Sequence, residues 1–591
     1  MASNSYRNRG ILRIVFLFTV ICKIGAEYNN PCCSFPCENR GVCLTQGFKE
    51  YTCDCANTGY YGDHCEIPTF WLRIKLWLKP GPYTTHYLLT NFQWMWNIIN
   101  NTSFMRNFIM RSVYLVRNSV IDSPPLFTSG HEYVTWESAA NLSYYARTLP
   151  PVPRDCPTPM GVKGPKTLPD VELFRKFFVR TKFKPDTINT NVLFAFFAQH
   201  FSHMFFKTDL KKGPGFQWGG HGIDVSHIYG PDVASSNKLR TFQDGKLKYQ
   251  MVNGEMWPPL LKDAPVTMTY PPNVKPEDKL GLGHEFFGML PGLVVFSAIW
   301  LREHNRVCDV MRIEHPEWTD EQLFQTTRLI IIGQTINIVI RDYVQHLSNY
   351  NLQLFFNPEL LFGYPFQYQN RITVEFNHLY HWHPLMPDDL EINGTKYTAQ
   401  QYVFNAEMPL KHGMKEMVDS FVKQRAGSVE PNNHPENTIH VALETIKHGR
   451  ELRMQPFNNY RKRFNLPVYK TFEELTGEKV LATELEQLYG DVDAVEFYVG
   501  ILLERHVNGG MLGQTVIELG GPNSVKGLMS NPICSPLYWR SSTFGGDVGF
   551  NLVKDSTLQK LFCMNMNGCP RIAFSVPLND DGKTDSMQDE L

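Results

Sequence analysis

The chain has no excess of charge of either sign and, after its first 26 residues, no long apolar run. Its 57 basic and 58 acidic residues give a formal net charge of −1, which provides no electrostatic basis for binding nucleic acid. The best apolar stretch after the N-terminal region is the thirteen residues 289–301, too short for a helix that crosses a bilayer. Internal repeats and low-complexity tracts are also lacking. These absences exclude a nucleic-acid partner and argue against a membrane-spanning helix.

The composition is that of a folded protein that enters the secretory pathway. A chain of 591 residues, 43% hydrophobic and 13% aromatic, can bury a large core and form more than one domain. Arg7 and Arg9 precede an apolar run at residues 14–21, and small residues follow at Gly25 and Ala26. This order is typical of a signal peptide, which we place at residues 1–26.

Two short segments rich in histidine carry the most functional information. They are Gln199-His-Phe-Ser-His203 and Tyr380-His-Trp-His-Pro384. A helical spacing of four or three residues would place each histidine and a second useful side chain on one face. His383 would be the proximal ligand of a haem iron, with its other ring nitrogen hydrogen-bonded. His203 would be the distal acid–base catalyst, assisted by Gln199, and Tyr380 would lie one turn from the iron ligand. For either motif alone, ordinary core packing is the alternative.

Together the two motifs resemble those of a known enzyme family. Residues 198–207 and 379–387 look like the distal and proximal haem segments of the prostaglandin-endoperoxide synthases, or cyclooxygenases, within the animal haem peroxidase superfamily. The resemblance extends from about residue 32 to residue 577. Relatives that bind haem covalently carry an aspartate immediately before the distal histidine. This chain has Ser202 there, which cannot form such an ester, so the resemblance implies non-covalent haem b.

The resemblance implies a mainly α fold with several parts. A disulfide-rich module similar to epidermal growth factor (EGF) would occupy residues 27–67, and a monotopic membrane-binding segment residues 68–116. A large helical catalytic domain like that of haem peroxidases would follow at residues 117–577. Within it, the longest helical patterns cover residues 173–183, 191–208, 292–315, 319–350 and 492–503.

Seven of the thirteen cysteines lie between residues 32 and 65, and six of these have EGF-like spacing. So small a domain needs disulfides for stability. By resemblance to the module and the family, we expect the pairs Cys32–Cys43, Cys37–Cys53, Cys55–Cys65 and Cys33–Cys156. Cys563 and Cys569 would close a short C-terminal loop, leaving Cys308 and Cys534 as buried free thiols.

Residues 68–116 have the composition of helices that lie in one membrane leaflet. Segments 70–78, 87–99 and 103–116 are rich in large apolar residues with interspersed arginine and lysine. Trp71, Trp77, Trp94 and Trp96 are typical of a membrane interface, although three core helices are the alternative. The family resemblance favours monotopic attachment, with a lipid substrate entering from the bilayer.

The last fourteen residues, 578–591, are polar and end in Gln-Asp-Glu-Leu591, which approximates a retrieval signal of the endoplasmic reticulum (ER). With the signal peptide, this tail predicts a peripheral membrane protein on the lumenal face of the ER and nuclear envelope. Glycosylation sequons at Asn100 or Asn101, Asn141 and Asn393 are compatible with that location.

The resemblance also implies a fatty-acid site beside the haem. Arg117 would pair with the substrate carboxylate, with Tyr350 as a hydrogen-bonding partner and Glu518 as a second pairing group. Ser524 matches the serine that aspirin acylates in the family, and it would line the channel without being a nucleophile of a catalytic triad. The apolar walls would be Val344, Leu347, Phe376, Leu379, Trp382, Ile517, Val525 and Leu528.

Three residues near this site depart from the family pattern. Asn523 and Leu512 stand at or near positions where relatives carry phenylalanine, and Val507 stands about where they carry histidine or arginine. Inhibitor selectivity and product stereochemistry therefore stay open.

The activity implied by the resemblance has two stages. A radical at Tyr380 would abstract hydrogen from arachidonate, two molecules of oxygen would add to give prostaglandin G, and peroxidase chemistry would reduce this hydroperoxide to prostaglandin H. The resemblance further implies a homodimer. The alternatives are a related fatty-acid dioxygenase, a plain haem peroxidase, or a haem-free adhesion protein that binds through its EGF-like module.

Overall fold

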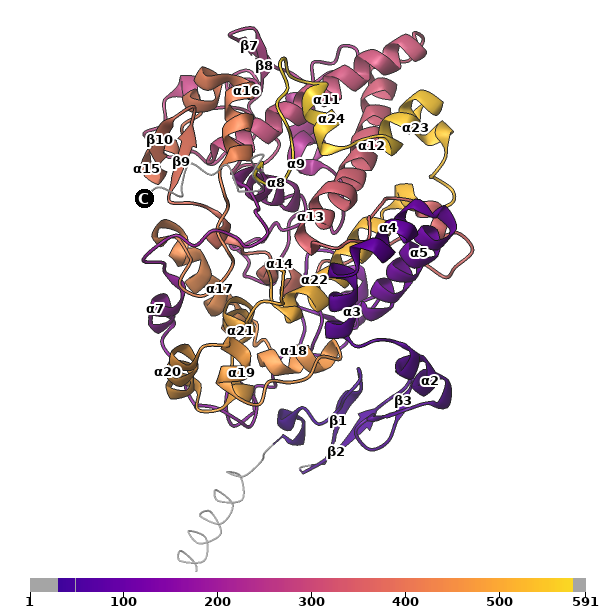
Figure 1. The fold of residues 1–591 in the computed structure, drawn as a ribbon, viewed down its shortest axis with the longest axis vertical. Helices are drawn as coiled ribbons and strands as arrows, with labels where there is room; N and C mark the ends of the chain where they lie inside the picture. Colours follow the sequence, from indigo (N-terminus) through magenta and orange to yellow (C-terminus); the bar gives the residue numbers. More distant parts are fainter. Residues whose placement is uncertain (1–29, 48, 578–591) are drawn as a thin grey trace, which may run out of the picture.

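The computed structural model describes residues 30–47 and 49–577, so the expected signal peptide and C-terminal tail lie outside the described residues. Helices dominate the described part of the chain, and its strands form only two-stranded antiparallel pairs (Figure 1). The N-terminal module lies at one end of the molecule, apart from a large helical body. This arrangement confirms the mainly α fold with a disulfide-rich N-terminal segment.

Disulfides take the place of a hydrophobic core in the N-terminal module. Strand β1 (Val42–Gln46) pairs with β2 (Glu50–Asp54), and β3 (Tyr60–Tyr61) pairs with β4 (Ile67–Pro68). Among the described residues before 70, the buried hydrophobic side chains are the cysteines 33, 53 and 65. The expected pairs Cys32–Cys43, Cys37–Cys53 and Cys55–Cys65 are all present. The module is therefore held by its covalent bonds, as its small size requires.

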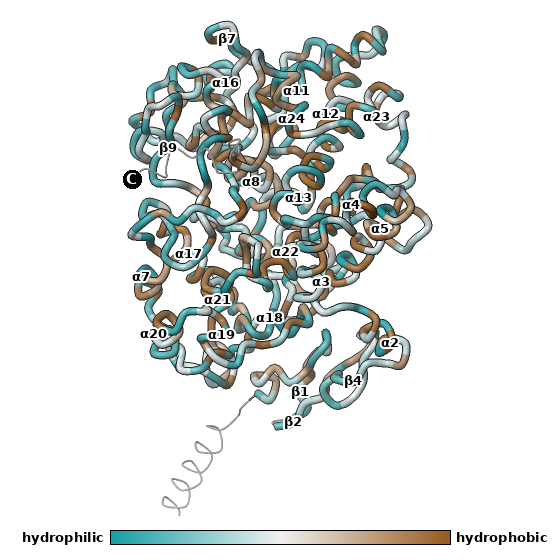
Figure 2. The backbone as a smooth tube through the Cα atoms, in the orientation of Figure 1, coloured by the Kyte–Doolittle hydropathy of each residue, from teal (hydrophilic) through white to brown (hydrophobic). Residues whose placement is uncertain are grey.

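Four short helices follow the module, where the sequence pattern predicted three. They are α2 (Phe70–Leu78), α3 (Pro82–Thr90), α4 (Gln93–Asn101) and α5 (Ser103–Val120). The expected helix at 87–99 is interrupted because Asn91 is extended and Phe92 has a left-handed backbone with φ of 59°. Large apolar side chains on these helices face outward, including Trp71, Trp77 and Trp94, which are 78%, 81% and 68% exposed. Trp96, also expected at the interface, is instead buried, and its indole N–H donates to the carbonyl of Leu88 at 2.7 Å. Figure 2 shows apolar stretches along this edge of the molecule.

The core of the body is built from four helices. Helix α8 (Val192–Ser202) packs against α11 (Pro291–Glu314) and α16 (Glu407–Lys423), and α11 packs against α12 (Asp320–Ile338). A capping box at Thr319 and Gln322 starts α12. The chain then continues through a π-helical turn at Val339–Val344 into α13 (Gln345–Ser348).

One helical stretch, Asp320–Ser348, is long and apolar enough to cross a membrane by length and composition. Because 72% of its apolar window is buried inside the fold, we assign it to the protein core. Among the described residues, no other helix meets these criteria.

Three further sequence predictions were too long. The segment 173–183 forms only the short turns Val171–Phe174 and α7 (Arg175–Phe178). The chain becomes extended at Val179, and the amide of Arg180 then donates a hydrogen bond to the carbonyl of His434 at 3.0 Å. The helix expected at 191–208 ends at Ser202, and that at 492–503 is divided into a turn at Val492–Ala494 and α21 (Phe497–Leu503).

The other elements complete the body around these helices. The helices are α6 (Trp136–Ala140), α9 (Ser226–Tyr229), α10 (Val233–Leu239), α14 (Val374–Leu379), α15 (Ala399–Tyr402), α17 (Ile439–Glu451), α18 (Phe457–Arg463), α19 (Phe472–Thr476), α20 (Lys479–Tyr489), α22 (Gln514–Met529), α23 (Asp547–Lys554) and α24 (Leu558–Cys563). The strand pairs are β5 (Phe127–Thr128) with β6 (Ala146–Arg147), β7 (Gln250–Val252) with β8 (Glu255–Trp257), and β9 (Asp389–Ile392) with β10 (Thr395–Thr398).

Candidate active site

The distal segment lies at the end of a buried helix. The side chain of Asn191 caps α8 by accepting a hydrogen bond from the amide of Phe194 at 3.1 Å. At the other end, Nδ1 of His203 lies 2.6 Å from the carbonyl oxygen of Gln199, which can only accept. Nδ1 must therefore carry the proton, and Nε2 keeps a free lone pair. Burial lowers the pKa of His203 below its ordinary value, so a neutral base is favoured at neutral pH.

Three histidines that sequence reasoning missed surround His203. The ring of His284 lies 5.1 Å from that of His203, and the rings of His200 and His227 are 4.6 Å apart. Burial lowers the pKa of all three, far below the ordinary value for His200 and His227. Lys207, also missed, donates to Ser226 Oγ at 2.9 Å. The distal histidine thus lies in a mostly buried cluster of neutral imidazoles. In the sequence, the only sign of this cluster is the high number of histidines between residues 200 and 227.

The proximal segment does not form the regular helix that its spacing predicted. Helix α14 ends at Leu379, Tyr380 is its C-terminal cap, and His383 begins a separate 3₁₀ turn that ends at Leu385. Pro384 contributes to this break, because it has no N–H group that could donate to the carbonyl of Tyr380 in a continuous helix. Tyr380 and His383 are therefore close in sequence but do not share one face of a helix.

His383 has the properties of an available metal ligand. Its Nδ1 atom is buried without a hydrogen-bond partner in the described part of the chain, so the expected bond from the second ring nitrogen is not formed there. Burial, reinforced by His434 at a ring distance of 5.6 Å, holds the pKa of His383 well below its usual range. His203 is among the groups whose charge would lower that pKa, which places the two imidazoles within electrostatic reach of each other.

Tyr380 is in contact with aromatic rings of its own segment and of the residues that follow helix α8. It stacks on Trp382 at a centroid distance of 4.5 Å and contacts Phe206 and Phe376, each at 5.2 Å. Burial raises the pKa of Tyr380 to about 12, against the opposing effect of the facing hydroxyls of Tyr343 and Ser524. The phenol is therefore protonated, and its hydroxyl is directed toward Ser524 on helix α22.

The predicted carboxylate-binding group is assembled from three distant parts of the chain. Arg117 lies in the last turn of α5, not after it as expected, and its Nη1 donates to Glu518 of α22 at 2.6 Å. Both side chains are mostly buried, at 19% and 15% exposure. Burial alone would lower the pKa of Arg117, but Glu518 and the hydroxyl of Tyr350 outweigh that effect and raise it. The guanidinium is thus permanently charged in a poorly solvated place.

The predicted channel residues divide into two groups by burial. Phe376, Leu379, Trp382 and Leu528 are buried, whereas Val344, Leu347, Ile517, Ser524 and Val525 are half-buried next to the core. The π-helical turn includes Val344 and the missed residue Tyr343, and such turns are frequent at functional sites. The three departures, Val507, Leu512 and Asn523, are all buried.

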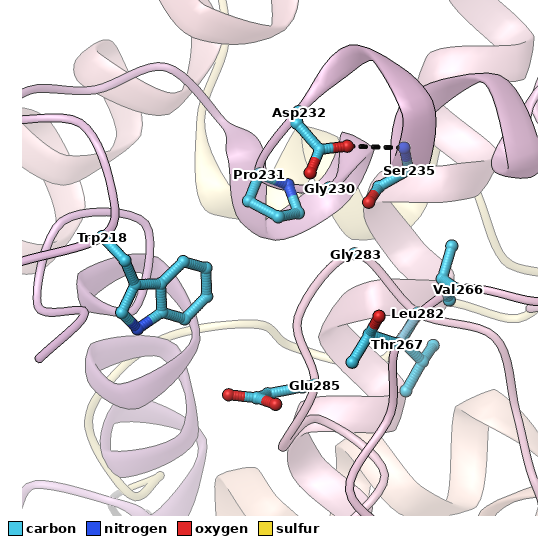
Figure 3. A pocket seen from close by; sticks show the side chains of 10 residues that line it. All are labelled: Trp218, Gly230, Pro231, Asp232, Ser235, Val266, Thr267, Leu282, Gly283 and Glu285. Atoms are coloured by element: carbon cyan, nitrogen blue, oxygen red, sulfur yellow. Dashed lines mark hydrogen bonds between the residues drawn. The ribbon is translucent and has the colours of Figure 1, made fainter. Parts of the chain in front are cut away.

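A cavity of about 250 Å³ opens beside the distal histidines (Figure 3). Its walls include Trp218, Asp232, Leu282 and Glu285. The Trp218 ring lies 6.0 Å from the ring of His284, so the cavity adjoins the histidine cluster. Nothing in the sequence pattern predicted it.

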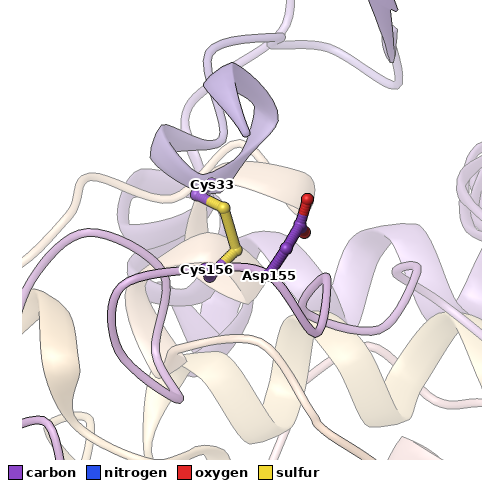
Figure 4. A group of neighbouring side chains, drawn as sticks. All are labelled: Cys33, Asp155 and Cys156. Carbon is purple, nitrogen blue, oxygen red and sulfur yellow. A yellow bond between two sulfur atoms is a disulfide. The ribbon is translucent and has the colours of Figure 1, made fainter. Parts of the chain in front are cut away.

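The described residues with metal-binding potential outside this site form one group, Cys33, Cys156 and Asp155. Figure 4 shows that the two sulfur atoms are joined in a disulfide. Oxidised sulfur is not a thiolate ligand, and Asp155 already accepts a hydrogen bond from Asn30 at 3.0 Å. The group is instead the expected tether between the module and the body. Cys563–Cys569 is also formed, and Cys308 and Cys534 are buried free thiols.

Comparison with known proteins places this geometry in a family. The family model for animal haem peroxidases matches residues 219–526. Prostaglandin G/H synthase 2 of Gallus gallus is 58% identical over 550 residues, covering 93% of this chain and 91% of the relative. Prostaglandin G/H synthase 1 of Mus musculus is 55% identical over 558 residues, covering 94% and 92%. The chain belongs to the prostaglandin G/H synthase family. Because type 1 and type 2 relatives are similar to it to nearly the same degree, identity alone does not assign it to either type.

Solved structures with lower similarity share the fold of this family. A fatty acid alpha-dioxygenase from Oryza sativa has a TM-score of 0.60 and 16% identity, covering 83% of this chain and 95% of its own. Peroxidase A from Dictyostelium discoideum has a TM-score of 0.59, also at 16% identity, covering 73% and 95%. At this identity the likeness concerns the fold alone. The relatives with high identity do not favour the alternative of a haem-free adhesion protein.

Proposed function

We propose that this chain is a bifunctional haem oxidoreductase of prostaglandin biosynthesis. It would convert arachidonate to prostaglandin G by dioxygenation through a tyrosyl radical, and then reduce this hydroperoxide to prostaglandin H. The observation that carries the proposal is the position of Tyr380. Its ring packs against Phe206, which follows the distal helix, while its hydroxyl faces Ser524 on the helix that carries Glu518. One phenol therefore touches both halves of the site.

The residues of the site fit a non-covalent haem b. His383 offers a neutral imidazole whose Nδ1 atom has no hydrogen-bond partner among the described residues. Burying an unpaired nitrogen costs free energy, and a bound haem could offset that cost. His203 and Gln199 would lie on the opposite side. The hydroxyl of Ser202 donates to the carbonyl of Gln199 at 3.3 Å, and this residue lacks the carboxylate through which relatives with covalent haem form an ester. Bound haem would supply the redox chemistry for peroxide cleavage and for oxidising a nearby phenol.

The peroxidase half depends on proton transfer at His203. The free lone pair on Nε2 would take the proton from an incoming hydroperoxide and return it to the departing oxygen. The carbonyl of Gln199 fixes the orientation of the ring, and its amide side chain is available to donate to the peroxide. His200, His227 and His284 stay neutral beside it, and the nearby ammonium group of Lys207 helps to hold His203 in its neutral form.

The oxygenase half depends on Tyr380 and Arg117. Loss of one electron and one proton from Tyr380 would give a phenoxyl radical, and the surrounding rings would keep water and stray reductants away from it. The guanidinium group of Arg117, which lies between Glu518 and Tyr350, would bind the carboxylate of arachidonate. The acyl chain would then lie along the half-buried residues Val344, Ile517 and Val525 toward Tyr380.

Attachment to one leaflet, dimerisation and residence in the ER lumen belong to the same proposal. The exposed residues Trp71 and Trp77 of α2 and Trp94 of α4, with Arg73 and Lys75 between those of α2, suit the interface of a membrane. Arg117 lies near the end of α5, the helix that follows α4, so a fatty acid leaving that leaflet would meet it early. Of the overlapping sequons, Asn101 is exposed, whereas Asn100 is buried and donates to the carbonyl of Asn351 at 2.8 Å. We therefore expect glycosylation at Asn101 and not at Asn100.

Two measurements on the purified chain test the function. Reconstitution with haem should give a Soret band, and addition of arachidonate should then cause oxygen uptake. A Soret band with peroxidase activity but no oxygen uptake would leave a plain haem peroxidase. Failure to bind haem would contradict the proposal altogether.

A further inference from the structure

The cavity beside the distal histidines has one aromatic wall, one apolar wall and two carboxylates. Figure 3 shows the Trp218 indole on one side and Leu282 with Val266 on the other, with Asp232 and Glu285 on different sides of the space between them. Val266 and Leu282 are buried, while Trp218 is 37% exposed and forms part of the open rim. The cavity is thus an open binding site shaped for a small molecule that is apolar in the middle and polar at its edge.

The loops that form the cavity are held in place by the fold. The loop with His284 and Glu285 approaches α9 so closely that a Cβ atom at Gly283 would lie 2.4 Å from the carbonyl oxygen of His227. Asp232 accepts a hydrogen bond from the amide of Ser235 at 2.7 Å, and Glu285 accepts one from the hydroxyl of Thr269 at 3.2 Å. Both carboxylates are therefore anchored at one oxygen and keep a second oxygen for a ligand.

The charges around the cavity favour a cation. Lys207 lies 4.8 Å from the Trp218 ring centroid, but its side chain is almost fully buried and is bonded to Ser226. Burial lowers its pKa to about 8, while Asp224 and Glu285 raise it. Lys238, which helps to lower the pKa of Asp232, is a second cation nearby. The two ammonium groups are outnumbered by the carboxylates Asp224, Asp232 and Glu285, of which Asp232 and Glu285 line the open space. His284 adds no charge, because burial holds its pKa far below the ordinary value.

Size and position identify the kind of ligand. A volume of about 250 Å³ is smaller than the ~300–1,000 Å³ of sites for drug-sized ligands, so it suits one aromatic ring with a short side chain. A twenty-carbon fatty-acid hydroperoxide is too long for this space, and its carboxylate would be repelled. The rings of Trp218 and His284 are 6.0 Å apart, and His284 lies 5.1 Å from His203, so a bound ring would be close to the peroxidase site.

We propose that this cavity binds the electron donor of the peroxidase reaction and selects single-ring phenols or aromatic amines with a positively charged side chain. The proposal rests on the peroxidase half of the proposed function. Each hydroperoxide accepts two electrons and two protons and becomes an alcohol and water. Two donor phenols supply them, each losing one electron and the proton of its O–H bond, to give two phenoxyl radicals. Trp218 would stack on the ring while Asp232 and Glu285 attract the ammonium group.

A series of donors matched in the ring tests this selectivity on the haem-containing full chain. Tyramine is cationic, p-cresol neutral and 4-hydroxyphenylacetate anionic, and each would be the donor in steady-state reduction of hydrogen peroxide. We expect the KM to rise in that order. Glu285→Gln and Asp232→Asn keep the hydrogen bonds to Thr269 and Ser235 but remove the charge. Each should raise the KM for tyramine about threefold, and the pair about tenfold, as expected for partly exposed charges.

Three controls separate charge selection from general damage. The KM for p-cresol should stay within about twofold in both variants, since this donor has no charge to attract. Glu486→Gln on α20, an exposed carboxylate at the far side of the body, should leave all three KM values unchanged. Trp218→Leu should raise the KM for every donor. Equal KM values for the three donors, or tyramine KM values unaffected by both charge variants, would overturn the proposal.

Binding without turnover gives a second readout. Saturation-transfer NMR of tyramine with the haem-containing chain, in the absence of peroxide, should show binding that weakens in Glu285→Gln and disappears in Trp218→Leu. If this pattern appears in a protein without peroxidase activity, the cavity is a binding site and the proposed function is wrong. If peroxidase activity is normal but tyramine does not bind, the cavity proposal alone is wrong.

Discussion

Replacing Arg117 with glutamine should weaken binding of arachidonate without changing the chemistry. A charge-assisted hydrogen bond contributes about 1.5–3 kcal/mol, equal to about 10- to 150-fold in affinity. Here the guanidinium already pairs with Glu518 at 2.6 Å, and the substrate must share it. The lower end of this range of affinities therefore applies. We expect the KM for oxygen uptake to rise about tenfold with kcat nearly unchanged.

Methyl arachidonate separates a carboxylate contact from a general packing effect. The ester lacks the charge, so its KM should already be raised about tenfold with the wild-type chain. In Arg117→Gln the acid and the ester should have nearly equal KM values, because the group that distinguishes them is gone. Arg117→Lys, which keeps the charge but loses the planar fork, should lie between.

The stability of the variant needs its own control. Without Arg117, the hydrogen bond left to the mostly buried Glu518 within the described part of the chain is that from Gln514 at 3.2 Å, and the free energy of unfolding should fall by about 1–3 kcal/mol. Adding Glu518→Gln removes the unpaired charge and should restore much of that loss in thermal denaturation. Peroxidase activity with hydrogen peroxide should stay near wild type throughout. Equal increases in the KM of acid and ester, or a parallel fall in peroxidase activity, would refute the assignment of Arg117.

Three further predictions concern the distal base, its pH dependence and the membrane. His203→Ala and His383→Ala should each abolish peroxidase turnover, and unchanged turnover in His203→Ala would show that the base is elsewhere. Because burial lowers the pKa of His203 below 6.5, its neutral form should persist as pH falls through 6.5, and activity should be lost only below that value; a midpoint above 6.5 in a pH–rate profile would contradict this. The protein should require detergent for extraction, since α2 and α4 expose Trp71, Trp77 and Trp94, and its release by alkaline carbonate alone would contradict attachment to the membrane.

The sequence predicted elements whose signals are local. The cysteine spacing between residues 32 and 65 predicted the disulfides of the module, and the apolar periodicity of 292–315 predicted α11 within one residue at each end. Prediction from apolar periodicity was wrong where a local feature interrupts the periodic pattern. Phe92 in a left-handed conformation divides one expected helix, and Pro384 separates Tyr380 from His383. Apolar periodicity does not report either effect.

The candidate site was only partly predictable for a different reason. Arg117, Tyr350 and Glu518 were proposed from family resemblance, and the structure brings them together across about 400 residues of sequence, which periodicity cannot anticipate. His284 and Trp218 carry no motif of their own. They become significant only in the folded chain, where the close approach at Gly283 holds the loop of His284 beside His203 and Trp218 packs near His284. Long-range packing of this kind requires the folded chain.

The most direct test of the account is the separation of two activities by Tyr380→Phe. The change keeps the ring that stacks on Trp382 and removes only the hydroxyl, so the fold and haem binding should survive. The account predicts that oxygen uptake with arachidonate disappears while reduction of hydrogen peroxide with a phenolic donor continues near the wild-type rate. If Tyr380 were only a packed core residue, the change would lower the free energy of unfolding by about 1–3 kcal/mol. Both activities would then fall together. A Tyr380→Phe enzyme that still consumes oxygen with arachidonate would contradict the central claim.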